Sequence, residues 1–277
     1  MPFISNKNDE ESVEIYYQDY GNGQPVVLIH GWPLSHRAWE GQVTEIVDAG
    51  FRCITYDRRG FGVSSAPWDA YNYDALASDL NELIEQLDLK DCVIVGFSMG
   101  GGEVVRYLSK YGDKRIEKAA LISSIIPLVK KKSDNPDGVP EEDLDNIMQA
   151  LKDDRVGFLK NFHENFYNYE NNKDSVSEQQ LHYDWTIASH ASFQGTIKAA
   201  EAWADTDFRE ELKNIKVPTL IVHGDADNIV PIETSGNQAA EGIENNQYHV
   251  ISGGPHGLNV THRTELNNIL LNFLGNK

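Results

Sequence analysis

Short apolar runs alternate along the chain with longer segments in which apolar residues recur every three or four positions. A short run bounded by glycine, proline or polar residues predicts a β-strand, and the longer spacing predicts an amphipathic helix. The strands are predicted at 13–20, 25–31, 51–57, 91–98, 116–124, 217–227 and 247–252, with helices over 35–50 and 76–87, after Ser98, after Pro231 and from about Thr261. The alternation is typical of an α/β protein with a doubly wound, mostly parallel sheet, here of about eight strands.

This alternation stops after residue 124 and resumes near residue 214. The intervening segment has no run typical of a buried strand. It begins with the polar stretch KKKSDNPDGVPEEDLD and continues with helix-period segments rich in aromatic residues. We therefore predict one α/β core made of residues 1–124 and 214–277, with residues 125–213 inserted as a helical cap.

Composition narrows the class of partner. A chain of 277 residues with 40% apolar content can fill a sizeable core. Its formal net charge of -19, from 43 acidic and 24 basic side chains, would repel phosphate backbones and anionic lipid surfaces. The sequence therefore predicts a protein that binds neither nucleic acid nor membranes.

The two cysteines and the N-terminal segment bear on location. Cys53 and Cys92 lie in apolar runs that predict neighbouring buried strands, which favours small core residues over a disulfide. The segment MPFISNKNDEESVEIYY lacks a basic stretch followed by an apolar one, and no window approaches the roughly 18 apolar residues of a membrane span. We expect a cytoplasmic protein.

The stretch VIVGFSMGGGEVV contains the pattern G-x-S-x-G around Ser98. On its own the pattern is compatible with a glycine-rich turn that happens to hold a serine. Here it falls where a predicted strand ends and a predicted helix begins, and a tight strand-to-helix turn exposes a serine oxygen when small residues flank it. We therefore predict that Ser98 is a nucleophile.

A serine nucleophile needs a histidine base, and that base needs a carboxylate to orient it. His256 in VISGGPHGLNV follows the last predicted strand in a loop of glycines and proline, which predicts the base. His249 falls inside that strand and His262 inside the final helix, so we expect structural or solvated roles for them.

For the acid, the stretch HGDADNIVP places Asp225 and Asp227 directly after a strand, between the serine and the histidine in chain order. That order is the one found in α/β-hydrolases. The residue pattern alone does not choose between the two carboxylates.

Acyl transfer also requires backbone N–H groups aimed at the developing oxyanion. One is predicted at Met99, which follows the nucleophile. The second is predicted in the loop HGWP after the strand at 25–31, at Trp32. Pro33 has no N–H and disfavours helical geometry at Trp32, so it should fix the direction of the Trp32 carbonyl.

Five stretches, HGWPLSHRAWE, YDRRGFGVSS, GFSMGGGEVVRY, HGDADNIVP and GGPHGLNVTH, occur in an order and spacing that resemble the cofactor-free (non-haem) haloperoxidase and aryl esterase family of α/β-hydrolases. The resemblance covers the whole chain and is looser in the cap. It implies the α/β-hydrolase fold and a triad of Ser98, Asp227 and His256, with Trp32 and Met99 as backbone donors of the oxyanion hole.

The same resemblance implies an apolar substrate pocket between core and cap. The pocket residues expected by match are Pro33, Phe97, Ile229 and Ile232 on the core side, with Phe158 and Phe162 of the cap closing it. Phe158 and Phe162 lie at helical spacing, which is equally typical of packing within the cap.

Members of the family are esterases on small or aryl esters. Some also perform perhydrolysis, in which hydrogen peroxide replaces water and the product is a peracid that oxidises halide without a metal. In the family, a proline directly after the oxyanion tryptophan goes with perhydrolase-type members, and this chain has Pro33. The resemblance therefore implies an ester substrate and hydrogen peroxide as a second reactant.

Other activities of the fold stay open from sequence: a lactonase, an amidase such as a lactamase, a C–C bond hydrolase, and, from another class, a non-catalytic receptor or interaction protein. No cofactor or metal is expected, because the nine histidines show no H-E-x-x-H spacing and GFGVSS lacks the G-x-G-x-x-G spacing of a nucleotide site. A dehalogenase or epoxide hydrolase would carry aspartate at Ser98. A homo-oligomer is compatible with the sequence, which does not determine the assembly state.

Overall fold

A single eight-stranded sheet organises the computed structural model, which describes residues 2–8 and 12–275. The strands lie in the order β1-β2-β4-β3-β5-β6-β7-β8. Only the pairings of β2 with β1 and with β4 are antiparallel. The strand bounds are β1 Phe3–Asn6, β2 Val13–Tyr20, β3 Pro25–Ile29, β4 Arg52–Tyr56, β5 Cys92–Phe97, β6 Ile116–Ile122, β7 Thr219–Gly224 and β8 Asn246–Ile251.

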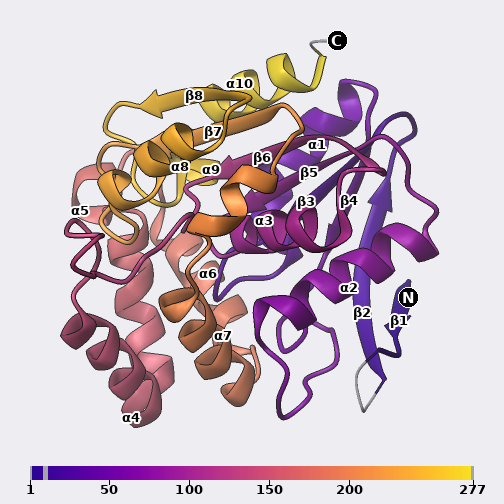
Figure 1. Cartoon of the computed structure of the whole chain (residues 1–277). Coiled ribbons are helices and arrows are strands. Elements are labelled where there is room, and N and C mark those ends of the chain that lie inside the picture. Colours follow the sequence, from indigo (N-terminus) through magenta and orange to yellow (C-terminus); the bar gives the residue numbers. More distant parts are fainter. Residues whose placement is uncertain (1, 9–11, 276–277) are drawn as a thin grey trace.

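Helices cover both faces of the sheet (Figure 1). On one face lie α1 (Glu40–Asp48), preceded by η1 (His36–Trp39), and α9 (Leu258–Thr261) with α10 (Arg263–Gly275). On the other lie α2 (Tyr73–Gln86), α3 (Gly100–Tyr111) and α8 (Gly236–Gly242), the last preceded by η3 (Ile232–Thr234). Strand β3 is buried on both sides, because alternate residues enter the two core clusters, as its continuous apolar run predicts.

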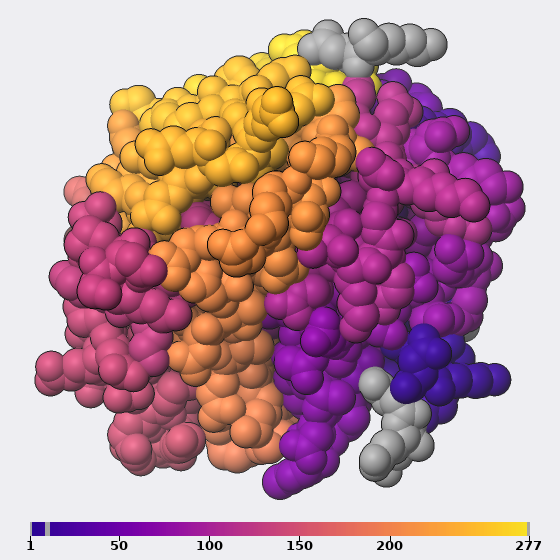
Figure 2. Space-filling model, in the orientation of Figure 1, coloured from indigo at the N-terminus to yellow at the C-terminus, as the bar shows by residue number. Residues whose placement is uncertain are grey.

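Four helices lie between β6 and β7, and we call them the cap helices: α4 (Glu141–Phe166), α5 (Tyr169–Asn172), α6 (Glu178–Ser189) and α7 (Phe193–Asp205), followed by η2 (Arg209–Asn214). They stand at one side of the sheet, below it in Figure 1. The purple segment after β4 and the orange α7 meet along the surface in Figure 2. Between these two parts of the chain, the N–H of Ser192, directly before α7, donates to the Gly60 carbonyl at 2.8 Å.

Several sequence predictions need correction. The short strand β1 was not predicted, because four residues give too little periodicity. The two cysteines are buried and free, as expected, but Cys53 lies on β4 and Cys92 on β5, with β3 between them. His262 lies in the turn between α9 and α10, not inside a helix.

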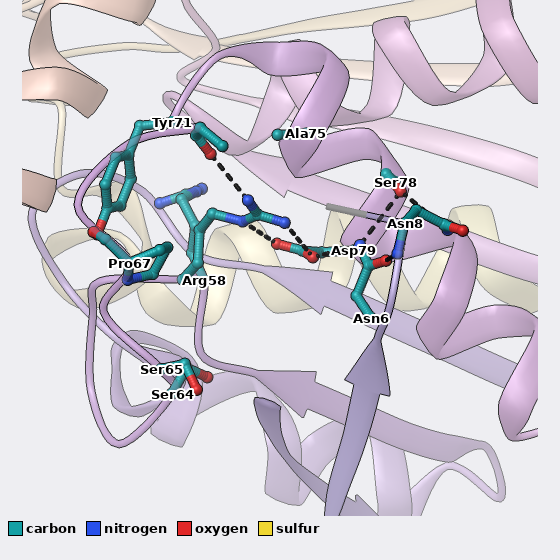
Figure 3. A network of polar contacts seen from close by, with 12 residues as sticks. Asn6, Asn8, Arg58, Ser64, Ser65, Pro67, Tyr71, Ala75, Ser78 and Asp79 are labelled. Atoms are coloured by element: carbon teal, nitrogen blue, oxygen red, sulfur yellow. Dashed lines mark hydrogen bonds and ion pairs between the residues drawn. The ribbon is translucent and has the colours of Figure 1, made fainter. Parts of the chain in front are cut away.

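A buried polar network fastens β1 and the loop after β4 to α2 (Figure 3). The Arg59 guanidinium donates to both Asp79 oxygens, at 2.6 and 2.7 Å, and to the Ala70 carbonyl at 3.0 Å. The Asn6 amide donates to Asp79 at 2.8 Å. Since Arg59 and Asp79 are buried, each compensates a charge that would otherwise be costly away from water.

We therefore expect Asp79→Ala to lower the free energy of unfolding by about 3–5 kcal/mol, because it leaves the Arg59 guanidinium buried without its carboxylate. Urea denaturation followed by circular dichroism measures the loss. Glu201→Ala, which breaks the partly exposed Lys198–Glu201 pair, is the control and should leave the midpoint almost unchanged. Equal midpoints for both variants would contradict the role of the buried pair.

Candidate active site

Ser98 lies in the turn that joins β5 to α3, in a left-handed backbone conformation with φ of 53°. This region is unfavourable for a residue with a side chain, so the surrounding structure must hold it. The Ser98 N–H donates to the Ile122 carbonyl at 2.9 Å, and the Ser98 carbonyl accepts from the Gly101 N–H at 3.0 Å. The turn is therefore fixed between the neighbouring strand and the first turn of the helix.

The glycines around Ser98 are required by close backbone approaches. A Cβ atom at Gly96 would lie 2.5 Å from the Gly100 carbonyl oxygen, and one at Gly100 would lie 2.6 Å from the Ile29 carbonyl oxygen. At Gly31, in the loop after β3, a Cβ atom would lie 3.1 Å from the Ser98 Cβ. The G-x-S-x-G pattern thus lets helix, turn and neighbouring loop meet at the serine.

The three side chains predicted as a triad form one hydrogen-bonded chain. His256 Nε2 lies 2.8 Å from Ser98 Oγ, and His256 Nδ1 lies 2.7 Å from Asp227 Oδ2. The side chains come from the loops after β5, β7 and β8. A carboxylate on Nδ1 holds the proton on that nitrogen and leaves Nε2 able to accept the serine proton.

Backbone donors complete the environment of Asp227. Its Oδ1 accepts from the N–H groups of Ile229 and Val230, at 2.9 and 2.8 Å. Burial opposes ionisation of Asp227, but the hydrogen bonds and charges of His256 and His223 outweigh it and hold its pKa below the ordinary range. The group is therefore a carboxylate throughout the neutral range.

The geometry separates the two candidate acids. Asp225 Oδ1 accepts from the Gly253 N–H at 2.6 Å, which ties the loop after β7 to the loop after β8. Of the two carboxylates, only that of Asp227 contacts His256. His249 lies exposed on β8, where the sequence placed it.

The two predicted oxyanion donors are both unused within the described residues. Neither the Trp32 N–H nor the Met99 N–H donates a hydrogen bond to any residue among 2–8 and 12–275. Both residues are buried, and a buried N–H without an acceptor is rare in folded proteins. The arrangement is typical of donors kept for a transient anion.

His30 orients the peptide that carries the Trp32 N–H. The Arg58 backbone N–H donates to His30 Nε2 at 3.0 Å, so the imidazole proton is on Nδ1, which donates to the Gly31 carbonyl at 2.8 Å. Burial, together with Arg58, lowers the pKa of His30 to about 3, so the ring is neutral. The Arg58 guanidinium is itself held by Glu103 of α3 at 2.6 Å. Because the C=O and N–H of a trans peptide point in opposite directions, fixing the Gly31 carbonyl fixes the Trp32 N–H.

The residues that the family resemblance predicts to line a substrate pocket lie in different parts of the structure. Phe97 is fully buried, with its ring 5.4 Å from His256. The Phe162 ring packs edge-on against the Trp32 ring, with 5.2 Å between the ring centroids, and stacks on the Phe158 ring, with 6.1 Å between the centroids. Of the others, Pro33 is buried, Ile229 is half-buried after Asp227, and Ile232 is half-buried at the start of η3.

The end of α4 contacts the loop that carries His256. The Gly257 N–H donates to the Phe166 carbonyl at 3.0 Å, and the Phe166 ring lies 5.0 Å from His256. A Cβ atom at Gly257 would clash with the Tyr167 ring, whose hydroxyl donates to the buried Asp184 of α6 at 2.5 Å. A cap helix therefore takes part in placing the histidine.

A cavity of about 820 Å³ opens on the other side of this contact. Tyr167, Asp184, Arg37 and Asn259 are among its lining residues, and Ser98 is not. None of Ser98, Asp227 and His256 lines this cavity, so it is separate from the triad. Ser98 itself is 6% exposed.

The sequence interpretation gave no role to two histidines of the site, His30 and His223. His30 directly follows β3 and His223 is the last residue but one of β7, and each precedes a glycine of a quoted motif, HGWP or HGDAD. That position is the only signal, and it is also typical of a core histidine, so the structure was needed to reveal their contacts.

The strand-to-helix turn at Ser98 and the order serine, acid, histidine are those of an α/β-hydrolase. Residues 24–262 match the alpha/beta hydrolase fold family, and the chain belongs to it. The family resemblance and fold class predicted from sequence are confirmed. Among the described residues, no helix has the length and apolarity needed to cross a membrane.

Its relatives include proteins named for halide oxidation. A putative non-heme chloroperoxidase of Synechocystis is 46% identical over 99% of this chain and 100% of its own length. A bifunctional esterase/perhydrolase of Acinetobacter calcoaceticus is 36% identical over 99% of both chains. The crystal structure of a bromoperoxidase from Bacillus anthracis superposes with a TM-score of 0.95, at 48% identity over 99% of this chain and 100% of that one.

The buried Asp184 should make stability depend on pH. Burial raises the pKa of Asp184 from 3.8 to about 6. A carboxyl whose folded-state pKa is raised contributes stability below its unfolded pKa, and that stability is lost as pH rises through about 6. Asp184→Asn removes the ionisation, so relative to wild type it should gain up to about 3 kcal/mol of unfolding free energy between pH 4 and pH 7.

Urea unfolding at a series of pH values measures this difference. Asp174→Asn, at an exposed carboxylate that lines the same cavity, is the matched control and should follow wild type. If the Asp184→Asn and wild-type curves run parallel, Asp184 does not ionise in this range.

Proposed function

We propose that the protein is a serine esterase that acts on small or aryl carboxylic esters through an acyl-enzyme, and that it also performs perhydrolysis. The observation that carries the proposal is the hydrogen-bonded chain Ser98–His256–Asp227, beside the backbone N–H groups of the buried residues Trp32 and Met99, which have no acceptor in the part of the chain that the structure describes. Nucleophile, base, orienting acid and oxyanion donors are the complete set that acyl transfer requires.

In the acylation step, His256 Nε2 takes the Ser98 proton as the serine oxygen attacks the ester carbonyl. The Trp32 and Met99 N–H groups stabilise the oxyanion, each contributing about 3 kcal/mol to the transition state. Asp227 stabilises the imidazolium. The carbon–oxygen bond to the alcohol then breaks, and His256 returns the proton to the departing alkoxide.

In the deacylation step, water or hydrogen peroxide attacks the acyl carbon. His256 removes a proton from the attacking molecule, the bond to Ser98 Oγ breaks, and the serine recovers its proton. Water releases a carboxylic acid and hydrogen peroxide releases a peracid, so no electrons are transferred on the enzyme. The released peracid then oxidises halide in a separate reaction, which needs no group of the protein.

The names of the relatives support both branches, since one is an esterase/perhydrolase and others are non-heme chloroperoxidases. Pro33 supports the second branch by its chemistry. It has no N–H and limits the backbone of Trp32, whose carbonyl can then accept a hydrogen bond from peroxide or peracid.

The segment 125–213 is proposed to act as a cap over this site. Phe162 reaches Trp32 from α4, and Trp203 of α7 lies 5.9 Å from the same ring. Aromatic walls of this kind favour apolar acyl or aryl groups. We place the enzyme in the cytoplasm on the sequence grounds given above.

Ser98→Ala should abolish ester hydrolysis, with a loss of order 10⁶ in kcat if serine, histidine and aspartate act as a unit. Turnover of an activated aryl ester and labelling by a serine-directed phosphonate measure it. Ser109→Ala, on the adjoining helix α3, is the control and should keep full activity. If the wild-type protein shows neither turnover nor labelling at Ser98, it is a non-catalytic protein of this fold.

Pro33→Leu should lower peracid formation relative to ester hydrolysis, because Trp32 regains backbone freedom and its carbonyl loses its fixed direction. Both products are measured from one ester at equal concentrations of enzyme, with and without hydrogen peroxide. An unchanged ratio of peracid to acid would remove Pro33 from the explanation of perhydrolysis.

A further inference from the structure

Two imidazoles contact the same oxygen of Asp227. His256 Nδ1 lies 2.7 Å from Oδ2, and His223 Nε2 lies 3.2 Å from it. Both histidines are 1% exposed, and the Asp227 carboxylate is fully buried. The reaction proposed above uses only His256, so it leaves the second imidazole without a role.

The neighbours of His223 fix the position of its proton. Nε2 lies 3.0 Å from the Val230 carbonyl oxygen, which can only accept. It also lies 3.4 Å from Ser235 Oγ, whose own proton is donated to the Pro231 carbonyl at 2.6 Å, so this hydroxyl also accepts. Nε2 therefore carries a proton. The ring N–H that donates to the Val230 carbonyl also lies close to Asp227, with 3.2 Å between Nε2 and Oδ2.

The position of His223 in the fold makes this contact a stable one. His223 is the last residue but one of β7. Its ring N–H donates to the Val230 carbonyl, which ties the end of the strand to the loop that follows it. Gly236 makes room for the ring, since a Cβ atom there would lie 2.9 Å from the His223 Cβ. His256 and His223 are the charged or titratable groups that contact Asp227 among the described residues.

We propose that His223 is a positioning residue that acts through Asp227. Its N–H shares Oδ2 with His256, fixes the rotation of the carboxylate and withdraws part of the negative charge from the catalytic imidazole. The proposal rests on the proposed function, in which Asp227 orients the base.

Charge withdrawal has a defined consequence for the reaction. A carboxylate that faces one imidazole alone favours the imidazolium form more strongly than one that also accepts from a second N–H. With His223 in place, the Asp227 carboxylate therefore stabilises the imidazolium form of His256 less strongly. The lowered pKa of Asp227, to which the His223 hydrogen bond contributes, agrees with this direction.

His223→Leu removes the donor at similar volume, and His223→Gln keeps an N–H near the position of Nε2. In the leucine variant we expect kcat for an activated aryl ester to fall about tenfold, with little change in KM. The midpoint of the acid limb of its pH–rate profile should rise by about 0.5–1 pH unit. The glutamine variant should recover most of both changes.

His249→Gln, on the neighbouring strand β8 and exposed, is the matched control and should reproduce wild type. Thermal unfolding of each variant separates loss of folded protein from loss of alignment. The positioning role is overturned if the acid limb of the pH–rate profile has the same midpoint in the leucine variant as in wild type. It is also overturned if the glutamine and leucine variants are equally impaired at every pH.

A measurement without turnover separates this proposal from the proposed function. The low-field proton resonance of the hydrogen bond between His256 Nδ1 and Asp227 is followed by NMR against pH, in Ser98→Ala protein with and without His223→Leu. If His223→Leu raises the pH midpoint at which this resonance titrates, the result supports the role of His223 even if no ester is hydrolysed. An unchanged midpoint overturns that role, whether or not the wild-type enzyme turns over esters.

Discussion

The left-handed turn at Ser98 is the constraint on which the rest of the site depends. With φ of 53° it is held by close contacts that only glycine allows at positions 96 and 100. Strand β5 lies between β3 and β6, inside the sheet. Since the carboxyl ends of parallel strands share one edge, the loops after β3, β7 and β8 reach the serine from both sides. The turn therefore determines where donors, base and acid must lie.

Buried polar networks hold those loops in one arrangement. Arg58 joins the loop after β4 to Glu103 of α3 and to His30, which directly follows β3. Asp227 joins the loops after β7 and β8. A buried charge is tolerated only where its partners are in place, so each network excludes alternative loop positions. The apolar faces of the sheet supply stability, and these networks supply the geometry of the site.

Periodicity predicted seven of the eight strands and the break in alternation between β6 and β7, because buried strands and amphipathic helices leave regular apolar patterns. It could not predict that Cys53 and Cys92 are separated by β3, since strand order in the sheet is not chain order. The motif around Ser98 and the loop at His256 were visible because glycine and proline mark special backbone geometry. The partners of His30 and His223 were not, because their contacts join residues brought together only by folding.

The helix α4 joins the wall of the proposed substrate pocket to the loop that carries His256. Its backbone leaves helical geometry at Asp154, with φ of -150° and ψ of 78°, and the Gly157 N–H donates to the Asp154 carboxylate at 2.9 Å, so a second helical segment begins there. That segment carries Phe162, which faces Trp32, and Phe166, which packs against His256 one turn later. A shift of the segment that admitted a larger acyl group at Phe162 would also move the Phe166 carbonyl that binds Gly257. Under the proposed function, substitutions on this helix therefore alter the alignment of His256 as well as the fit of the substrate.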